Sequence, residues 1–468
     1  MEKYTIKFTE DSSKYIDIYN KIKELIECKE ILDGEKLPTI RILSKYLKVN
    51  KITVINAYKK LSTEGYIYQV QGSGSYARRK EAVKNLKNEY KDIFNKIASG
   101  ELKDFIDFTG ETTSTNFFKV ETLREVFNEV LTRDGIDALT YNDSLGYKSL
   151  RESINNNFWN GKNCLDNMLI ISGAQQGIDI VAKALININE AVIVEKPTYS
   201  GALTVLKLRG ANVLQVPIEN DGVNIEYLEK LIKKYKVKCF YTMSYFQNPT
   251  GVSCSLKKKK KIIELAYKYN FYIIEDDYLS ELIYDDEIEY LPYRSLDSKR
   301  VIYIKSFSKI FLPGIRIGYL LAPTEFNEIL HASKVSTDIS TSSLMQRALN
   351  EYITKGYWVD HIKCLNREYS NRYNYVVKLI KERLNGLVTF HEPKGGLNLF
   401  LNINKNLNVT SKELFYKLKE KNTIITPGVI FFHNAKDGEW SFRLGFSQLD
   451  YKNIDKGINN IYEILKGR

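Results

Sequence analysis

The chain has 468 residues, which favours two or three domains over a single compact core, and its apolar content of 43% is typical of a globular protein. No run reaches the about 20 apolar residues of a membrane-spanning helix, and the N-terminus lacks the apolar core of a signal peptide, so a cytoplasmic protein without a membrane partner is expected. Five scattered cysteines argue against disulfides and against a metal site, whereas the net charge of +12 leaves a nucleic-acid partner open.

The first predicted elements are a helix over about 15–31, two short helices within 39–65, and two strands in "YIYQVQGSGSYA". Helix, turn, helix and hairpin in this order are typical of a winged helix-turn-helix. The segment 36–63 carries a local basic surface with no acidic residue, made of Lys36, Arg41, Lys45, Lys48, Lys51, Lys59 and Lys60. We therefore expect a DNA-binding domain at 1–79, followed by a charged linker at 80–104.

Beyond residue 105, short apolar runs alternate with helical patterns, which predicts a mostly parallel sheet covered by helices on both faces. The predicted strands are "NMLIISG", "AVIVEKP", "VKCFYTM", "FYIIEDD", "VIYIKSFS" and "IGYLLAP". The lysine run 257–261 opens a helical pattern and is interpreted as a solvated helix start rather than a nucleic-acid patch. A long helical stretch over 340–384 leads into "GLNLFLNI", "TIITPGVIFF" and "WSFRLGFS". We expect a large part at about 105–340 and a smaller α+β part at about 341–468.

Polar and glycine-rich segments follow several of these strands, where ligands collect in parallel sheets. In "SGAQQG" the backbone amides of Ala174 and Gln175 can hold a phosphate at a helix N-terminus, although a glycine turn before a helix is common. Asp276, Asp277 and Tyr278 are expected just past another strand, and one of the two carboxylates can pair with a protonated pyridine nitrogen. The alternative is a helix cap with solvated acids.

Three further segments fit the same chemistry. Asn248 in "QNPTG" can present its amide to a phenolic oxygen, or the segment only turns the chain. Tyr199 in "EKPTYSG" offers a flat face for ring stacking. Lys309 in "KSFSKIFLPGIRIGY" can form a Schiff base, or is one lysine among many. Together these segments predict a pyridoxal 5'-phosphate site.

Because they carry these motifs in this order, residues 105–465 resemble the class I and II aminotransferases, which have the fold-type I pyridoxal phosphate architecture. Residues 15–77 resemble the winged-helix regulators of the GntR family. The two in this order resemble the MocR group of bacterial regulators. The resemblance implies a multidomain fold, in which an N-terminal winged helix-turn-helix precedes an α/β aminotransferase-like domain with a smaller α+β C-terminal subdomain.

The resemblance also implies roles for individual residues. Lys309 would be the Schiff-base lysine, Asp276 the partner of the pyridine nitrogen with Asp277 as the less favoured candidate, and Tyr278 and Asn248 the neighbours of the ring hydroxyl. The phosphate would be bound by Ser306, Ser308, Arg316, Ala174 and Gln175. Tyr141 would reach the phosphate of a neighbouring subunit, which implies a homodimer.

Arg443 in "SFRLGFS" matches the arginine that grips a substrate α-carboxylate, with a surface strand arginine as the alternative. No arginine stands near Tyr199 to bind a second acidic group of an effector, which argues against γ-aminobutyrate. At the DNA end, the helix that starts near Asn50 would enter the major groove, with Lys51 and Thr53 facing the DNA. The resemblance adds Arg41 and Gly72, where glycine lets the wing approach a backbone closely.

Three functions are compatible with these residues. The leading hypothesis is a pyridoxal phosphate-dependent transcriptional regulator that binds a double-stranded DNA operator and senses an amino acid or a related amine through an internal aldimine. The second is a catalytically active aminotransferase with an accessory DNA-binding domain. The third, a DNA-binding protein with a cofactor-free dimerisation domain, is disfavoured because all the cofactor positions are present.

Overall fold

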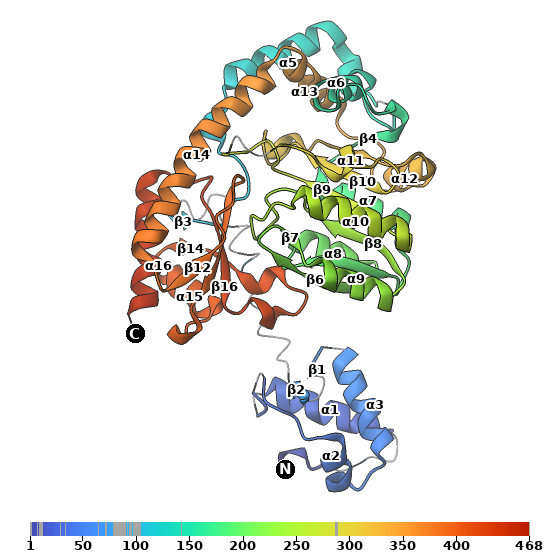
Figure 1. Cartoon of the computed structure of the whole chain (residues 1–468), viewed down its shortest axis with the longest axis vertical. Coiled ribbons are helices and arrows are strands. Elements are labelled where there is room, and N and C mark those ends of the chain that lie inside the picture. The colour runs from blue at the N-terminus through green and yellow to red at the C-terminus, as the bar shows by residue number, and fades with distance from the viewer. Residues whose placement is uncertain are drawn as a thin grey trace. The chain divides into compact units, whose positions relative to one another are not determined.

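The chain forms two compact units, Met1–Lys103 and Asp104–Arg468, and each is described by itself (Figure 1). The computed structural model describes residues 2–467 except 7, 9–12, 29, 33, 64, 71–72, 78–89, 91, 93–95, 97–103, 142 and 286–288. Short 3-10 turns occur at Glu2–Tyr4, Thr115–Phe117, Gly135–Leu139, Leu165–Asn167, Pro313–Ile315, Thr324–Phe326, Lys405–Leu407, Gly428–Phe431 and Ala435–Gly438.

The first unit is the expected winged helix-turn-helix. It contains α1 (Lys14–Glu27), α2 (Ile40–Leu47), α3 (Lys51–Thr63) and the antiparallel hairpin of β1 (Ile67–Val70) and β2 (Gly74–Ala77). Apolar residues of α1 recur at helical spacing and pack with Leu43, Val54 and Leu61 into one core. The Thr39 hydroxyl caps α2, and Lys48 ends that helix in the left-handed conformation. The predicted turn between the two helices is therefore confirmed.

The second unit is built on an eight-stranded sheet with the order β4-β11-β10-β9-β8-β5-β6-β7. The pairs that join β10, β9, β8, β5 and β6 are parallel, whereas β11 is antiparallel to β10 and β4. The strands are β4 (Met168–Ile171), β5 (Ala191–Lys196), β6 (Asn212–Glu219), β7 (Gly222–Val223), β8 (Val237–Thr242), β9 (Tyr272–Asp277), β10 (Val301–Ser306) and β11 (Gly318–Leu321). The mostly parallel sheet expected from the buried apolar runs is confirmed.

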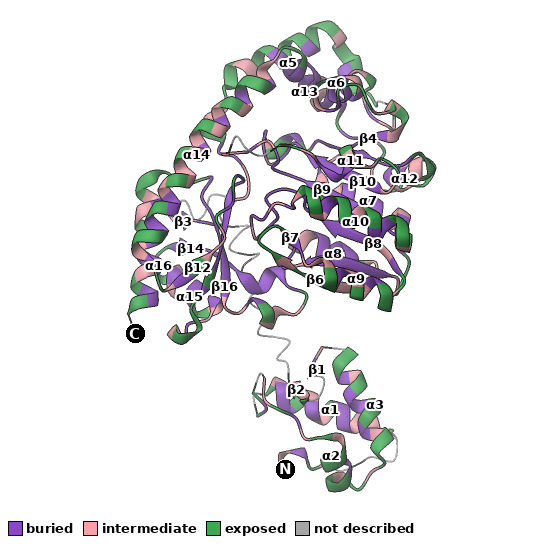
Figure 2. Ribbon diagram, viewed as in Figure 1, coloured by how far each residue is buried: buried purple, intermediate pink, exposed green. Residues whose placement is uncertain are grey.

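The helices of this part bury residues on their inner faces and expose residues on their outer faces (Figure 2). They are α5 (Val120–Asp134), α6 (Lys148–Trp159), α7 (Ala174–Leu185), α8 (Ser200–Leu208), α9 (Ile225–Lys234), α10 (Leu256–Tyr269), α11 (Tyr293–Leu296) and α12 (Asn327–Val335). The lysine run does lie at the start of α10, but Lys259 is only 2% exposed. The expectation of a solvated run is wrong at this position, because Lys259 shares the inward face of the helix with Ile262 and Ala266.

The expected helical stretch over 340–384 is two helices, α13 (Ser343–Thr354) and α14 (Tyr357–Arg383). They separate at Gly356, whose positive φ of 78° suits glycine. Helix α13 packs on α5 and α6 beside the large sheet, whereas α14 runs on to pack against α16 (Tyr451–Lys466) (Figure 1). One long helix thus links the two parts of this unit.

The C-terminal part holds an antiparallel sheet of β12 (Val388–Phe390), β13 (Asn398–Ile403), β16 (Ser441–Gly445) and β15 (Thr426–Pro427), together with α15 (Ser411–Glu420). The start of the unit returns to this part, because β3 (Ile106–Asp107) pairs in parallel with β14 (Thr423–Ile424). The smaller α+β part predicted from the sequence is present. Among the described residues no helix is long and apolar enough to cross a membrane, and no His, Cys, Asp and Glu cluster could hold a metal ion.

Candidate functional site

A cavity of about 150 Å³ lies at the carboxyl ends of β4, β5, β8, β9 and β10. Its lining includes every predicted cofactor residue except Tyr141, although these residues are spread over more than 130 positions of the sequence. The lining residues are Glu111, Ala174, Gln175, Tyr199, Met243, Asn248, Asp276, Tyr278, Ser306, Ser308, Lys309 and Arg316. Polar groups from five strand ends of the mostly parallel sheet thus line one cavity, which is called the strand-end cavity below.

Asp276 is the carboxyl group at the end of β9 that lines the cavity. Its Oδ2 accepts a hydrogen bond of 2.5 Å from the Tyr241 hydroxyl, and its Oδ1 has no hydrogen-bond partner among the described residues. Burial raises the pKa of Asp276 to about 7, although the Tyr241 hydroxyl lowers it in part. A buried carboxyl with a spare oxygen can pair with a cation that enters the cavity.

Asp277 points to the opposite face of β9, as the alternation of side chains along a strand requires. Its carboxylate accepts hydrogen bonds from Lys305 Nζ at 3.0 Å, from the Ser280 hydroxyl at 2.7 Å, and from the hydroxyls of Tyr290 and Tyr303. These partners satisfy Asp277 within the fold. Both acids are buried, so the alternative of solvated acids at a helix cap is wrong.

One end of the cavity, the predicted anion-binding end, is formed by the start of α7 and by the segment after β10. Gly173 precedes the helix with a φ of 97°, and a Cβ at this position would lie 2.8 Å from Arg316 Nη2. Arg316 donates to the Ser172 carbonyl at 2.9 Å and lies 3.4 Å from the Ser308 hydroxyl. Free amides at a helix N-terminus, a guanidinium and hydroxyls together suit a phosphate group.

Lys309 also lines the cavity, and its amine forms a 2.9 Å ion pair with Glu111 Oε2. The second oxygen of Glu111 accepts a hydrogen bond from Arg443 Nη1. Arg443 comes from β16 and is 1% exposed, so the alternative of a surface arginine is wrong. It also donates to the Asn248 side-chain oxygen at 3.0 Å. The structure thus brings Lys309, Asn248 and Arg443 together around a carboxylate of the chain itself.

Two tyrosines complete the walls. The Tyr199 hydroxyl donates to Gln175 Oε1 at 3.2 Å, and a Cβ on Gly201 would lie 2.4 Å from the Tyr199 ring. Tyr278 donates to the Phe246 carbonyl at 2.8 Å. Burial raises the pKa of both phenols, so both remain neutral hydrogen-bond groups at physiological pH. Tyr141 lies apart from this set, with 77% of its surface exposed.

The sequence analysis missed two polar residues of this site, Glu111 and Tyr241. Tyr241 belongs to a buried strand run, where its hydroxyl gives no signal of its own. Glu111 follows Gly110 in a segment without periodicity, and only its contacts with Lys309 and Arg443 reveal it.

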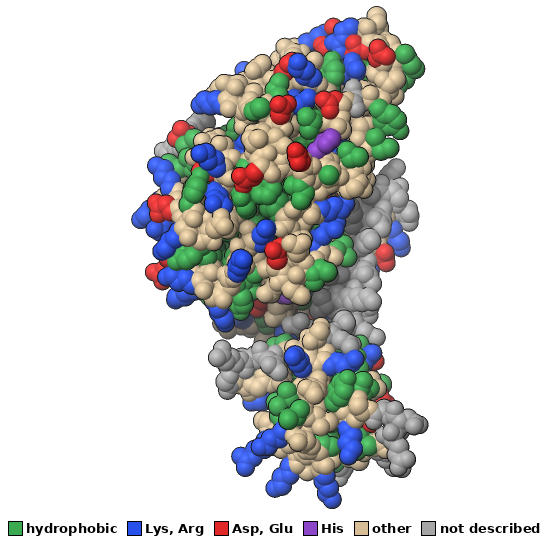
Figure 3. All heavy atoms as spheres, turned by 90° about the vertical axis from the view of Figure 1, so that its right-hand side faces the viewer, with side chains coloured by type: hydrophobic (Ala, Val, Ile, Leu, Met, Phe, Trp, Pro, Cys, Tyr) green, Lys and Arg blue, Asp and Glu red, His purple; other side chains and the backbone are tan. Residues whose placement is uncertain are grey.

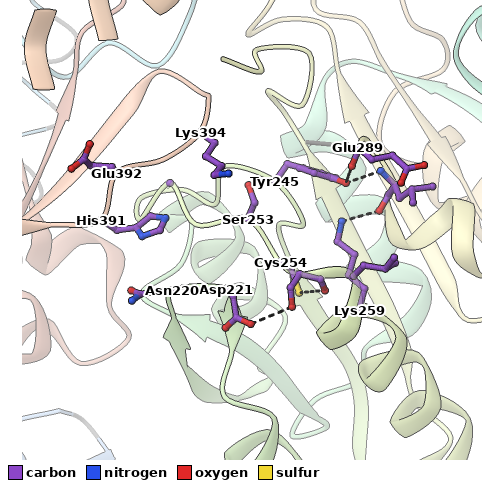
Figure 4. A pocket seen from close by; sticks show the side chains of 14 residues that line it. Asn220, Asp221, Tyr245, Ser253, Cys254, Lys259, Glu289, His391, Glu392 and Lys394 are labelled. Atoms are coloured by element: carbon purple, nitrogen blue, oxygen red, sulfur yellow. Dashed lines mark hydrogen bonds between the residues drawn. The ribbon is translucent and has the colours of Figure 1, made fainter. Parts of the chain in front are cut away.

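A separate cavity of about 560 Å³ shares no lining residue with the strand-end cavity. Figure 4 shows Lys259 and Tyr245 on one side of it and His391 on the other. The Lys259 amine lies 3.8 Å from the centre of the Tyr245 ring and donates to the Leu291 carbonyl at 2.8 Å. These contacts satisfy the buried lysine within the fold.

In the first unit, the predicted DNA contacts lie on the two helices of the helix-turn-helix. Arg41 on α2 and Lys51 on α3 are exposed, and Thr53 is half-buried. The Asn50 side chain accepts from the Ile52 amide at 3.0 Å and so caps the start of α3. Figure 3 shows basic side chains projecting from this unit. Gly72 lies outside the described residues.

Residues 110–461 match the family of class I and II aminotransferases, and residues 14–76 match the gntR family of bacterial regulatory proteins. Aromatic-amino-acid aminotransferase 1 of Thermococcus litoralis is 31% identical over 78% of this chain and 89% of its own length. The uncharacterized HTH-type transcriptional regulator YdfD of Bacillus subtilis is 28% identical over 97% of this chain and 96% of its own.

Among solved structures, the second unit is similar to the α-aminoadipate aminotransferase LysN of Thermus thermophilus, which was crystallised with N-(5'-phosphopyridoxyl)-L-leucine. The TM-score is 0.73, the identity is 28%, and the match covers 78% of this chain and 93% of that one. The chain therefore belongs to the class I and II aminotransferase family and carries an N-terminal GntR-family domain, which is the arrangement of the MocR-type regulators.

Proposed function

We propose that this protein is a pyridoxal 5'-phosphate-dependent transcriptional regulator, in which the first unit binds operator DNA and the second senses an amino compound. The observation that carries the proposal is the strand-end cavity, which holds a lysine, a buried carboxyl and an anion-binding end on the same chain as a GntR-family domain. Relatives that match over nearly the whole chain are named HTH-type transcriptional regulators, which supports this function over an enzyme.

The residues of the cavity fit the cofactor. The Oδ1 of buried Asp276, which has no partner among the described residues, suits a protonated ring nitrogen. That nitrogen would be the cationic partner that stabilises the ionised carboxylate. Because Gly173 has no side chain, Arg316 can lie against the start of α7, where its guanidinium and the helix amides can bind a phosphate that Ser306 and Ser308 can also contact. When bound, pyridoxal 5'-phosphate supplies an aldehyde that condenses with amines and a ring that withdraws electrons.

The remaining cavity residues would position the cofactor and the ligand. The Lys309 amine is the group that would hold the cofactor covalently. The Tyr199 ring can stack on the cofactor ring, and Tyr278 and Asn248, which also line the cavity, can contact its hydroxyl. Arg443 contacts the same Glu111 carboxylate as Lys309 and could bind the carboxylate of a ligand.

The first unit would bind DNA through α3 in the major groove, with Lys51 and Thr53 near the bases, and Arg41 would also reach the DNA. Seven basic residues and no acidic one within 36–63 would provide the sequence-independent attraction to phosphates. We also propose a homodimer, in which the exposed Tyr141 reaches the phosphate site of the partner. A dimer would present two DNA-binding units to two half-sites.

The alternative is an active aminotransferase with an accessory DNA-binding domain, which the match to the Thermococcus enzyme favours. One experiment separates the two functions. Purified holoprotein is mixed with a panel of amines and amino acids, and cofactor absorbance, ketoacid formation and binding to DNA from its own promoter are measured. The regulator changes its DNA binding with a ligand that also changes the absorbance, and it turns over slowly. Rapid multiple turnover without specific DNA binding would establish the enzyme instead.

A further inference from the structure

Glu111 lies within the cavity and contacts both cations that the proposed function assigns to ligand and cofactor. Its Oε1 accepts from Arg443 Nη1, and its Oε2 lies 2.9 Å from the Lys309 amine. Asn248 adds a third contact, since its Nδ2 lies 3.4 Å from Oε1. A carboxylate bound to an arginine and beside the reactive lysine is the arrangement that the carboxylate of an amino-acid ligand would otherwise make.

The segment that carries Glu111 is fastened on both sides. The Phe108 carbonyl accepts from the Gly445 amide at 2.7 Å, and the Thr109 carbonyl accepts from Arg443 Nη2 at 3.1 Å. Beyond Glu111, the Thr113 amide donates to the Lys309 carbonyl at 3.0 Å. The backbone on either side is therefore held by β16 and by the lysine segment, so Glu111 is directed into the cavity by the fold.

The charges favour retention of Glu111 in this position. Burial by itself would raise the pKa of Glu111, but the positive charges of Arg443 and Lys309 outweigh it and hold the pKa well below its usual range. Arg443 is almost completely buried, so its charge needs a partner. A carboxylate that is part of the same chain competes at a high effective concentration with one that arrives from solution.

We propose that Glu111 is a built-in carboxylate that occupies Arg443, so that the cavity selects primary amines without an α-carboxylate over the matching α-amino acids. This inference rests on the proposed function, because it concerns the ligand of the same cofactor site. An α-amino acid must displace Glu111 from a buried arginine, whereas an amine leaves that pair intact. When the cofactor takes Lys309, Glu111 Oε2 becomes available to a hydrogen-bond donor of the ligand.

The test compares wild type with Glu111→Gln, which keeps the shape of the side chain and removes its charge. Holoprotein is titrated with two matched pairs, phenethylamine with phenylalanine and putrescine with ornithine. Cofactor absorbance and calorimetry give the dissociation constants. Glu121, which is exposed, provides the control Glu121→Gln. We expect wild type and the control to bind at least one amine about tenfold or more tightly than its amino acid, and Glu111→Gln to gain about 10- to 100-fold in affinity for the amino acid.

The double variant Glu111→Gln, Arg443→Gln separates this role from a general effect on the fold. The gain in amino-acid affinity should disappear in the double variant, because it requires the vacated arginine, while the affinity for the amine changes little. Glu111→Ala should show the same gain as Glu111→Gln, so that a folding defect in one variant does not decide the result.

Two results would overturn the inference. One is a wild-type holoprotein that binds both amino acids more tightly than the amines. The other is a folded Glu111 variant with no gain in amino-acid affinity, whichever ligand wild type prefers. Failure of the proposed function is a different result, because wild type would then show no absorbance from bound cofactor before any ligand is added.

Discussion

Replacement of Asp276 by asparagine tests the electrostatics of the proposed cofactor site. The side chain is 1% exposed, and it keeps one oxygen without a partner among the described residues. Asparagine preserves the shape and the contact with Tyr241 but cannot form an ion pair with a protonated ring nitrogen. Loss of one member of a buried ion pair costs about 3–5 kcal/mol. We therefore expect the affinity for pyridoxal 5'-phosphate to fall by on the order of 10²- to 10³-fold.

The affinity is measured by titration of cofactor-free protein with pyridoxal 5'-phosphate, followed by absorbance, with Asp137→Asn at an exposed position as the matched control. Equal cofactor affinity in wild type and Asp276→Asn would refute the ion pair.

The same variant carries a pH signature in the cofactor-free protein. Burial raises the pKa of Asp276 from 3.8 to about 7, so between these values the folded protein retains a proton that the unfolded chain has lost. The free energy of unfolding therefore falls as the pH rises through this window. Roughly three pH units at about 1.4 kcal/mol per unit set an upper bound of about 4 kcal/mol. Denaturant titrations at about pH 5 and about pH 8 span roughly two units of this window, so wild type should lose up to about 3 kcal/mol relative to Asp276→Asn. The same pH dependence of the free energy of unfolding in wild type and in Asp276→Asn would contradict a raised pKa for Asp276.

Four further substitutions test other parts of the account. Lys309→Ala should abolish the absorbance of covalently bound cofactor, because alanine has no amine, and a retained spectrum would exclude Lys309 as the attachment point. Arg41→Ala and Lys51→Ala should each weaken operator binding roughly 5- to 150-fold if they contact bases, measured by fluorescence anisotropy, and unchanged affinity in both would argue against this docking. Asp277→Asn should cost about 3 kcal/mol of stability in denaturant titrations, because buried Lys305 loses a partner, and cofactor affinity should stay unchanged. A loss of cofactor affinity without a loss of stability would mean that Asp277, and not Asp276, is the partner of the ring nitrogen.

The sequence predicts the large sheet well because its central strands are continuous apolar runs, and the residues proposed to bind the cofactor lie at or after their ends. Strand β6 was not predicted, since Gln215 and Pro217 interrupt its apolar pattern. The residue pattern by itself could not decide between Asp276 and Asp277, and only the family resemblance favoured Asp276. The choice depends on which face of β9 each side chain takes, and on the distant Lys305 that satisfies Asp277.

Glu111 illustrates what a sequence pattern cannot predict. Its two cationic partners lie 198 and 332 positions away, so nothing in its neighbourhood signals a buried pair. The same reason applies to Lys259, where the lysine run predicts a solvated surface and only tertiary packing against Tyr245 explains the burial. Pairings of this kind arise when the fold joins segments that have no local relation.

The most direct test of the central claim is the effect of an amine on DNA binding in wild type and in Lys309→Ala. Binding to promoter DNA is followed by fluorescence anisotropy, with and without a ligand that changes the cofactor absorbance of wild type. We expect the ligand to change the affinity or the form of the wild-type complex, because it binds through the cofactor site. Lys309→Ala should bind the same DNA with unchanged basal affinity and show no response to the ligand, since the first unit has its own core. A full response in Lys309→Ala would contradict regulation through the cofactor.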